Sequence, residues 1–580
     1  MSVLTDLIAK GFFPVQLPPG FSSEEFSEAI DEIKEPWGNN PPKKYSKLEK
    51  YSVARSSYYR RAVRILNPVA FYYLAQSIEN FWDKIEYHFS LSEISLSTPK
   101  IEAGLRAIKI NKFSELYEEK ITRASGYRFV LITDITSFFP SIYTHSIPWA
   151  LHKKEVAKTN RQKIAAYYGN ILDARCMNLQ DGQTIGIPIG PDTSHIIAEI
   201  IGVAIDIQLH ESLGKWPAGF RYVDDYYLFF EDRNSAEKCL AQLTKAITNF
   251  ELQVNAAKTR IVEVKELVEE NWKYNLKELN LSQNKKKQKN DIHSFFERLF
   301  SLESRYTDES IIKYGLKQIS SSIIRKSNWK VFEAYILKCG FSYPNTLQII
   351  AQLLSTYNQY NYPINTGAVK RFCDTLIKSH AISDHHGEVS WLLWICKELE
   401  IIIDLEAARE IQGMSSAVCT LILLDMQHKS LAPDVLTDAY LGQYSTQDAL
   451  DSEGWLLAYE AGKRSWLKNA DHEYISAHPY FKDLLSEGVS FYNTDAICSP
   501  IFKLKQDNFD YDLFDSDEDI ESRFDFDDMD EEYFDRSSDD DDDDEDDDDD
   551  DDDDDEDDED DDEDDDEDDD DDDEDFNPFL

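Results

Sequence analysis

Two apolar stretches that deliver aspartates constrain this chain more than any other feature. The stretch 128–143 begins as an apolar strand with Asp134 at its end, and the stretch 220–230 holds Asp224 and Asp225 between two β-prone flanks. Apolar strand, acidic turn and apolar strand together predict a β-hairpin with both aspartates at its tip. The acids from two strands can converge on a pair of Mg²⁺ ions, which prefer carboxylate oxygens. We therefore expect a two-metal phosphoryl-transfer site, with an acidic surface turn as the alternative.

Two further motifs accompany these strands. Between them lies the glycine-bearing sequence 186–194, GIPIGPDTS, and after them comes the stretch 252–259, LQVNAAKT, which contains Lys258. In order and spacing, the four motifs resemble those of the palm of reverse transcriptases, in which residues 222–225, YVDD, form the acidic turn. The resemblance implies a right-hand-type fingers and palm and the activity of an RNA-directed DNA polymerase, a nucleotidyltransferase.

Details of the motifs narrow the resemblance to one subgroup. The stretch 141–152, the GIPIGPDTS sequence and the opening segment 11–21 resemble the abortive-infection (Abi) and defence-associated reverse transcriptases of bacteria. This resemblance implies antiphage defence, with synthesis that is primed by protein and poorly templated or untemplated. Ile189 stands where the wider family usually has Gln, and it lacks the donors and acceptors of an amide, so ordinary template reading is in doubt.

The resemblance also implies roles for individual residues around the metals. Asp134 and Asp224 would hold two Mg²⁺ ions, with Mn²⁺ as a substitute, and Asp225 would support them. Ile135 would offer only its backbone carbonyl to a metal. Lys258 would protonate the leaving pyrophosphate, and a solvated lysine is the alternative reading of that residue.

A second group of residues is expected to bind the nucleotide. Arginine forks match phosphate oxygens, and Arg61 is the first choice to hold the triphosphate, with Arg64 as its rival. The resemblance implies that Phe139 would crowd the sugar 2′ position and so favour dNTPs over rNTPs, with an ordinary core phenylalanine as the alternative. Gly190 lets backbone come close to the nascent base pair, beside Ile189.

Periodicity and composition divide the remainder of the chain. Amphipathic stripes follow one another from about residue 296, which predicts an all-α, HEAT-like helical array after an α+β fingers and palm. A polar basic loop is expected at 284–290. The expected parts are an N-terminal segment with fingers at 1–125, a palm at 126–265, a thumb-like basic connector at 266–295, a helical repeat domain at 296–500 and a disordered acidic tail at 501–580.

The charge of the chain is concentrated in its tail. The formal net charge is −53, but residues 501–580 contain 52 acidic and four basic residues, which leaves a net of −5 for the first 500. Overall acidity therefore does not exclude nucleic-acid binding. The tail is a solubility segment or a nucleic-acid mimic that occupies a basic channel. No C-x-x-C pair and no run of about 18 apolar residues occurs, so we expect a cytoplasmic protein without membrane contact. The resemblance to Abi enzymes implies that the cytoplasm is bacterial.

These observations leave three functional hypotheses. The first is a defence polymerase that takes dNTPs, makes a DNA product, uses an RNA template, a non-coding RNA or no template, and forms a homo- or hetero-oligomer. The second is conventional RNA-templated cDNA synthesis, as in retron-like systems. The third is a catalytically silent binding scaffold, against which the intact Asp134, Asp224 and Asp225 argue.

Overall fold

The computed structural model describes most of the chain before the acidic tail. The chain divides into two units, Met1–Asp539 and Asp540–Leu580, and every described residue belongs to the first. The described residues are 2–56, 59–102, 104–111, 113–267, 272, 275, 276, 279, 281–306, 310–467, 472–504, 524 and 525. The predicted tail therefore lies almost entirely outside the described residues.

A four-stranded antiparallel sheet forms the palm. Its strand order is β6-β7-β5-β8, with bounds β5 Phe129–Thr133, β6 Ala218–Tyr222, β7 Asp225–Phe230 and β8 Arg260–Glu263. Side chains alternate across this sheet, so Leu131 and Leu228 face the main core while Val130 and Phe229 face the other side. Helix α12 (Arg233–Asn249) packs on the sheet, and α6 (Phe113–Ala124) contacts its β6–β7 edge.

The N-terminal part of the chain supplies a long hairpin and a group of helices. Strands β1 (Glu49–Ser56) and β2 (Tyr59–Ile65) pair antiparallel, and β2 leads into α4, where Pro68 occupies the first turn and the Asn67 side chain caps the Val69 amide. The helices of this part and of the palm are α1 Val3–Gly11, α2 Glu24–Glu28, α3 Ile30–Trp37, α4 Pro68–Asn80, α5 Trp82–Phe89, α7 Phe138–Ser141, α8 Ser146–His152, α9 Lys154–Thr159, α10 Tyr168–Leu179 and α11 Asp192–Leu213. Short pieces are η1 Ala165–Tyr167, η2 Val264–Glu266, β3 Lys100–Ile101 and β4 Ile108–Lys109.

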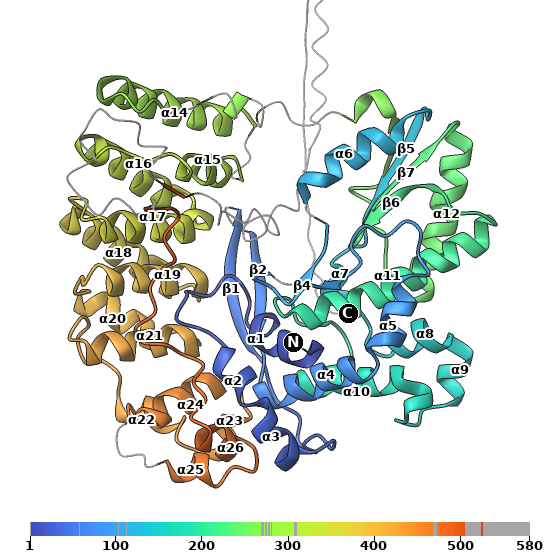
Figure 1. The fold of residues 1–580 in the computed structure, drawn as a ribbon, viewed down its shortest axis with the longest axis horizontal. Coiled ribbons are helices and arrows are strands. Elements are labelled where there is room, and N and C mark those ends of the chain that lie inside the picture. The colour runs from blue at the N-terminus through green and yellow to red at the C-terminus, as the bar shows by residue number, and fades with distance from the viewer. Residues whose placement is uncertain are drawn as a thin grey trace, which may run out of the picture. The chain divides into compact units, whose positions relative to one another are not determined.

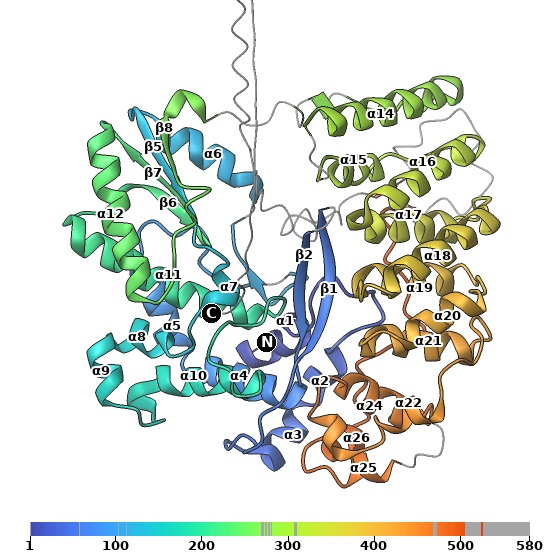
Figure 2. The ribbon, with the colours of Figure 1, turned by 180° about the vertical axis from the view of Figure 1, so that it is seen from behind.

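The C-terminal half of the described chain is helical, which confirms that prediction. Every described element from Lys285 to Ser486 is a helix. One row contains α14 Lys285–Tyr306, α16 Trp329–Ser342, α18 Thr366–Ala381 and α20 Leu405–Gln412, and the other contains α15 Ser310–Ser320, α17 Leu347–Gln359, α19 His386–Glu398 and α21 Ala417–His428. Each helix contacts the next member of its own row, and Figures 1 and 2 show the helices stacked in sequence order. We call α14 to α21 the helical array.

The elements that follow the helical array pack against the N-terminal part of the chain. Its last elements are α22 Asp438–Gly442, α23 Gln447–Leu450, α24 Trp455–Lys463, α25 Glu473–Ser476 and α26 Phe481–Ser486, with β9 Lys503–Leu504 pairing with β10 Phe524–Asp525. Trp37 donates its indole N–H to Asp483 of α26, and the Phe12 ring lies in one cluster with Trp455 and Phe491. Figure 1 shows α2 and α3 beside α24 and α26. Burial of these aromatic rings joins the two ends of the described chain.

The β1–β2 hairpin is attached to the array by polar contacts. The Glu49 carboxylate accepts the Ala417 amide at 2.7 Å, and the Ser52 amide donates to His386 at 3.2 Å. Arg60 binds both carboxylate oxygens of Glu388, at 2.6 and 2.7 Å. A bidentate pair of this kind is a strong directional contact. The hairpin is therefore positioned by the array as well as by the palm.

The basic segment at 284–290 differs from its prediction as a loop. Lys285 begins α14, and the Asn284 side chain accepts the amides of Lys286 and Lys287 at the start of this helix. Gln288 is buried and its side-chain amide donates to the Ile323 carbonyl. The helix forms here because one face of the segment packs on the array.

Among the described residues, no helix is both long enough and apolar enough to span a membrane.

Candidate active site

The β6–β7 hairpin carries the two adjacent aspartates, as predicted, but only Asp224 lies in the turn itself. Tyr222 pairs with Asp225, so Val223 and Asp224 are the two residues of the turn and Asp225 is the first residue of β7. Val223 has φ = 55°, in the left-handed region that β-branched residues rarely adopt. Such a backbone conformation persists only where surrounding contacts hold it.

Two side chains hold the Val223 backbone in this conformation. Its N–H donates to the Ser97 hydroxyl at 2.8 Å, and its carbonyl accepts from the Arg221 guanidinium at 2.9 Å. Both side chains are buried. The turn that contains Asp224 is therefore held by hydrogen bonds to both the N–H and the carbonyl of Val223.

Arg221 is in turn held by two carboxylates of α11. It forms ion pairs of 2.9 Å with Glu199 and with Asp206, and all three side chains are buried. Burial alone would lower the pKa of Arg221, but the two carboxylates raise it well above its ordinary value, so the guanidinium stays charged. Burial raises the pKa of Asp206, and Arg221 opposes this shift.

A serine-rich segment completes this buried network. The hydroxyls of Ser95 and Ser97 donate to the two oxygens of Glu199, at 2.6 and 3.1 Å, and Ser92 donates to Asp206 at 2.7 Å. Gly202 is required beside the network, because a Cβ there would lie 2.7 Å from the Arg221 guanidinium. These residues are absent from the sequence-based site. Two features of the sequence could have identified this network. Arg221 lies inside an apolar strand, and the acids Glu199 and Asp206 lie seven residues apart on an apolar helix.

Asp134 lies at the same end of the sheet as the turn. Thr133 is the last residue of β5 and pairs with Tyr226, which places Asp134 beside the start of β7. The Asp134 backbone carbonyl accepts the Asn255 amide at 3.0 Å, and the Lys258 ammonium lies 3.5 Å from the Asp134 carboxylate. The structure thus places Asp134, Asp224, Asp225 and Lys258 at the same end of the palm sheet.

Ile135 follows Asp134 in a short bridge to Val254. The residue is buried, and the two backbone bonds around it run from Thr136 to Gln253 and from Asn255 to Asp134. Neither bond uses the Ile135 carbonyl. Carboxylates and a backbone carbonyl make an all-oxygen donor set, which fits a hard divalent cation such as Mg²⁺.

Phe139 lies beside the glycine-bearing loop. Its carbonyl accepts the Ile187 amide at 2.9 Å, and its half-buried ring meets the His195 ring edge to face at 5.4 Å. Gly186 has φ = 84°, and a Cβ there would lie 3.0 Å from the Pro140 carbonyl oxygen. The loop can approach the Phe139 helix this closely because the residue is glycine.

The other end of this loop is joined to strand β2. The Arg64 amide donates to the Ile189 carbonyl at 2.8 Å, and Gly190 has φ = 122° with Pro14 packed against it. Arg106 donates to the Gly190 carbonyl and pairs with the buried Asp192. Burial lowers the pKa of Arg64. The structure therefore brings Arg64, Ile189 and Gly190 together; their binding of a nucleotide stays a prediction.

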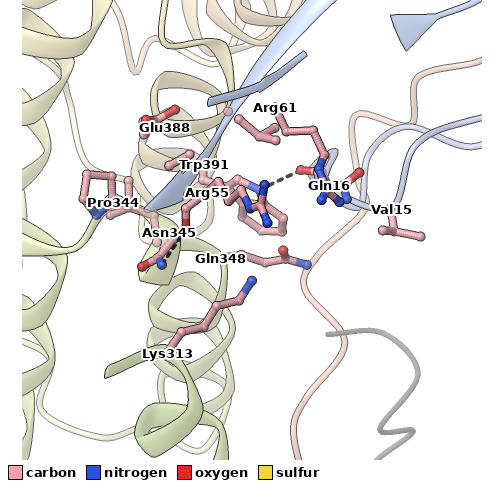
Figure 3. A pocket seen from close by; sticks show the side chains of 14 residues that line it. Val15, Gln16, Arg55, Arg61, Lys313, Pro344, Asn345, Gln348, Glu388 and Trp391 are labelled. Atoms are coloured by element: carbon pink, nitrogen blue, oxygen red, sulfur yellow. Dashed lines mark hydrogen bonds between the residues drawn. The ribbon is translucent and has the colours of Figure 1, made fainter. Parts of the chain in front are cut away.

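Arg61 lies at a different place from Arg64. It lines a cavity that the hairpin forms with Lys313, Gln348 and other residues of the helical array (Figure 3). The structure thus separates the two candidate triphosphate ligands: Arg64 adjoins the Gly190 loop, and Arg61 adjoins the array.

Comparison with known proteins identifies the domain that contains these motifs. Residues 73–290 match the family model described as reverse transcriptase (RNA-dependent DNA polymerase). No curated protein matches the chain.

Two solved structures are similar over much of the chain. Apo telomerase from Candida tropicalis has 11% identity and a TM-score of 0.29, with 68% of this chain and 73% of that chain covered. Telomerase from Candida albicans in complex with the TWJ fragment of telomeric RNA has 13% identity and a TM-score of 0.26, with 70% and 67% covered. Both TM-scores are below 0.5, so the family match and the geometry of the motifs, and not these two structures, identify the domain. The chain contains a reverse transcriptase domain at residues 73–290, and it is therefore a nucleotidyltransferase of the RNA-directed DNA polymerase type.

Proposed function

We propose that this protein is a defence-associated reverse transcriptase that polymerises dNTPs by two-metal catalysis. The observation that carries the proposal is that Asp134, Asp224, Asp225 and Lys258 all lie at the same end of the palm sheet. The antiphage role rests on the resemblance of the motifs to Abi enzymes. The all-α array after the palm, which we interpret as HEAT-like, supports that part of the proposal.

Asp134 and Asp224 would hold two Mg²⁺ ions, or Mn²⁺ in their place, with Asp225 and the Ile135 carbonyl in support. When bound, the ions would supply charge neutralisation at the α-phosphate and would activate the attacking hydroxyl. The buried Arg221 network has the complementary role of keeping the Asp224 turn in its strained conformation. Most of the rate enhancement then comes from positioning and charge rather than from covalent chemistry.

The remaining residues act on the nucleotide. Arg64, beside the Gly190 loop, is placed to contact the triphosphate, and Arg61 is the alternative from the array side. Ile189 and Gly190 would adjoin the nascent base pair, and Phe139 would exclude a 2′-hydroxyl. Lys258 would donate a proton to the leaving pyrophosphate, and in the structure its ammonium is paired with Asp134 at 3.5 Å.

The deciding experiment uses the purified full-length protein with Mg²⁺ and each labelled dNTP, without template or primer. We expect incorporation, and we expect the label to remain on protein until protease treatment. Incorporation that depends on added RNA would support the templated, retron-like alternative instead. The family match to RNA-dependent polymerases favours testing that alternative directly, by sequencing the product made from a defined RNA.

An Asp224→Asn variant is the matched control, because it removes a charge while keeping the shape of the side chain. We expect it to lose about three orders of magnitude in incorporation rate, as several kcal/mol of transition-state stabilisation depend on the metals. In bacteria challenged with phage, this variant should also lose protection. Full protection by the inactive variant would support the scaffold reading.

A further inference from the structure

We propose that His380, His385 and Glu388 form a binding site for a divalent transition-metal ion, with Zn²⁺ as the best fit, and we call it the array metal site. His380 lies in the last turn of α18, His385 is the N-cap residue of α19, and Glu388 lies in the first turn of α19. Each residue offers one ligand atom, and the three atoms all lie within 4.8 Å of one another. The inference goes beyond the proposed polymerase, because these residues belong to the helical array and not to the palm.

The distances within the cluster are close to those between the ligands of one ion. The Nδ1 atoms of His380 and His385 are 2.8 Å apart, and His385 Nδ1 lies 3.7 Å from Glu388 Oε1. Zinc bonds of about 2.0–2.2 Å in a tetrahedral site place neighbouring ligand atoms about 3.4 Å apart. An ion therefore requires side-chain shifts of roughly 1 Å, which rotation of the two half-buried imidazoles can supply.

The donor atoms of the array metal site select the class of metal. Two imidazole nitrogens and one carboxylate oxygen suit Zn²⁺ and similar transition metals, whereas Mg²⁺ prefers oxygen ligands. Burial lowers the pKa of both His380 and His385, so at neutral pH both rings are in the neutral form that binds a metal. Three protein ligands leave the fourth position of a tetrahedral ion to water.

The charges around the cluster favour a cation. Arg60 binds the two oxygens of the buried Glu388 carboxylate, at 2.6 and 2.7 Å. Because a carboxylate has about four lone-pair sites, Oε1 retains one for the ion while Arg60 fixes the orientation of the group. Asp384, the residue before His385, adds a second carboxylate to this turn. Two carboxylates and one guanidinium leave a net negative charge beside the two imidazoles.

The alternative is a direct hydrogen bond between the two rings, in which one of the two Nδ1 atoms carries a proton. In that arrangement Arg60 alone satisfies Glu388. His386 belongs to neither arrangement, because its Nδ1 accepts the Ser52 amide. The hydrogen bond gives the cluster no more affinity for Zn²⁺ than an ordinary histidine has, so a measurement of zinc binding separates the two arrangements.

The array metal site lies where the helical array holds the β1–β2 hairpin. Glu388 binds Arg60 of β2, His386 accepts the amide of Ser52 in β1, and α19 contacts β1 (Figure 1). An ion that joins the end of α18 to the first turn of α19 would fix the carboxylate that receives Arg60. Its role would be structural: it stabilises the attachment of the hairpin to the array.

The test measures Zn²⁺ binding by the full-length protein without an affinity tag, with Mg²⁺ in excess so that the many carboxylates of the chain hold Mg²⁺. Bound zinc is counted after equilibrium dialysis, and Co²⁺ is used in parallel because its visible absorption reports nitrogen ligands. The test variants are His380→Gln and His385→Gln. The matched control is His428→Gln, because His428 is an exposed histidine of the same array that lies outside the cluster. Thermal unfolding without zinc verifies that each variant is folded.

We expect the parent protein and His428→Gln to bind one more Zn²⁺ per chain than either test variant, and Zn²⁺ to raise the unfolding temperature of these two proteins only. Loss of one ligand should weaken binding at the site at least about tenfold, since even the loss of a group that only orients a ligand has an effect of that size. Equal zinc binding and equal Co²⁺ absorption in all four proteins would overturn the proposal and leave the direct hydrogen bond. An inactive Asp224→Asn protein should bind this Zn²⁺ unchanged, so failure of the array metal site and failure of the proposed polymerase are distinguishable.

Discussion

Replacing Ser97 by alanine tests whether the buried network positions the catalytic turn. The Ser97 hydroxyl accepts the Val223 N–H at 2.8 Å, accepts from Arg221 at 3.3 Å and donates to Glu199 at 3.1 Å. Alanine leaves the Val223 amide without this acceptor in a place where water has little access. We therefore expect the turn to relax away from φ = 55°.

The magnitude follows from the cost of an unsatisfied donor. A buried N–H that loses its acceptor costs about 1–3 kcal/mol. If about 1.4 kcal/mol of that cost opposes the conformation that presents Asp224, the catalytic rate falls about tenfold. The Gly190 loop and Arg64 are not touched by Ser97, so the KM for dNTP should change less than about twofold.

Ser95 provides a matched control for this experiment. Its hydroxyl donates to Glu199 at 2.6 Å, as that of Ser97 does, and accepts the Ser97 amide at 3.2 Å, but among the described residues it forms no hydrogen bond with Val223 or Asp224. Both variants should lose a similar amount of stability in urea unfolding. Only Ser97→Ala should show the tenfold loss in kcat, measured in steady-state incorporation with varied dNTP. Equal losses of kcat in the two variants would refute positioning and leave a structural role alone.

Three further predictions follow from other contacts. Burial raises the pKa of Glu49 to about 8, so the folded state holds an extra proton between about pH 4.5 and 8, and stability falls across that window by up to about 1.4 kcal/mol per pH unit. Glu49→Gln should flatten this dependence and be the more stable protein above pH 8, as measured by urea unfolding from pH 5 to 9. Arg60→Ala removes the bidentate partner of the buried Glu388 carboxylate and leaves it only the longer contact with His385 at 3.7 Å, so it should cost about 3–5 kcal/mol, a loss that Arg60→Ala/Glu388→Gln should partly restore. Phe139→Ala should raise rNTP incorporation relative to dNTP by about 10- to 100-fold in competition assays, and an unchanged ratio would contradict its place at the sugar.

Local sequence preferences predict where the palm forms and which acids it presents. Apolar runs that end in Asp134 and surround Asp224 specify strands and a tight turn through local preferences, which need no distant partner. The register of β5 against β7 then follows, because a one-residue shift would reverse the buried and exposed faces of each strand. The helical half was also predicted, since amphipathic periodicity is a local property.

The contacts that hold these parts in place could not be predicted from local preferences. Arg221 is recognisable as a positioning residue once Glu199, Asp206 and Ser97, from other parts of the chain, surround it and all four side chains are buried. The sequence favoured Arg61 over Arg64 as the triphosphate ligand, whereas packing of the hairpin places Arg61 at a cavity against the helical array and Arg64 at the Gly190 loop. Residues 285–290 are helical, and not the predicted loop, because Gln288 is buried and its side-chain amide donates to the Ile323 carbonyl. Strand and turn preferences depend on neighbouring residues, whereas the burial of a charge depends on partners that only the folded chain brings together.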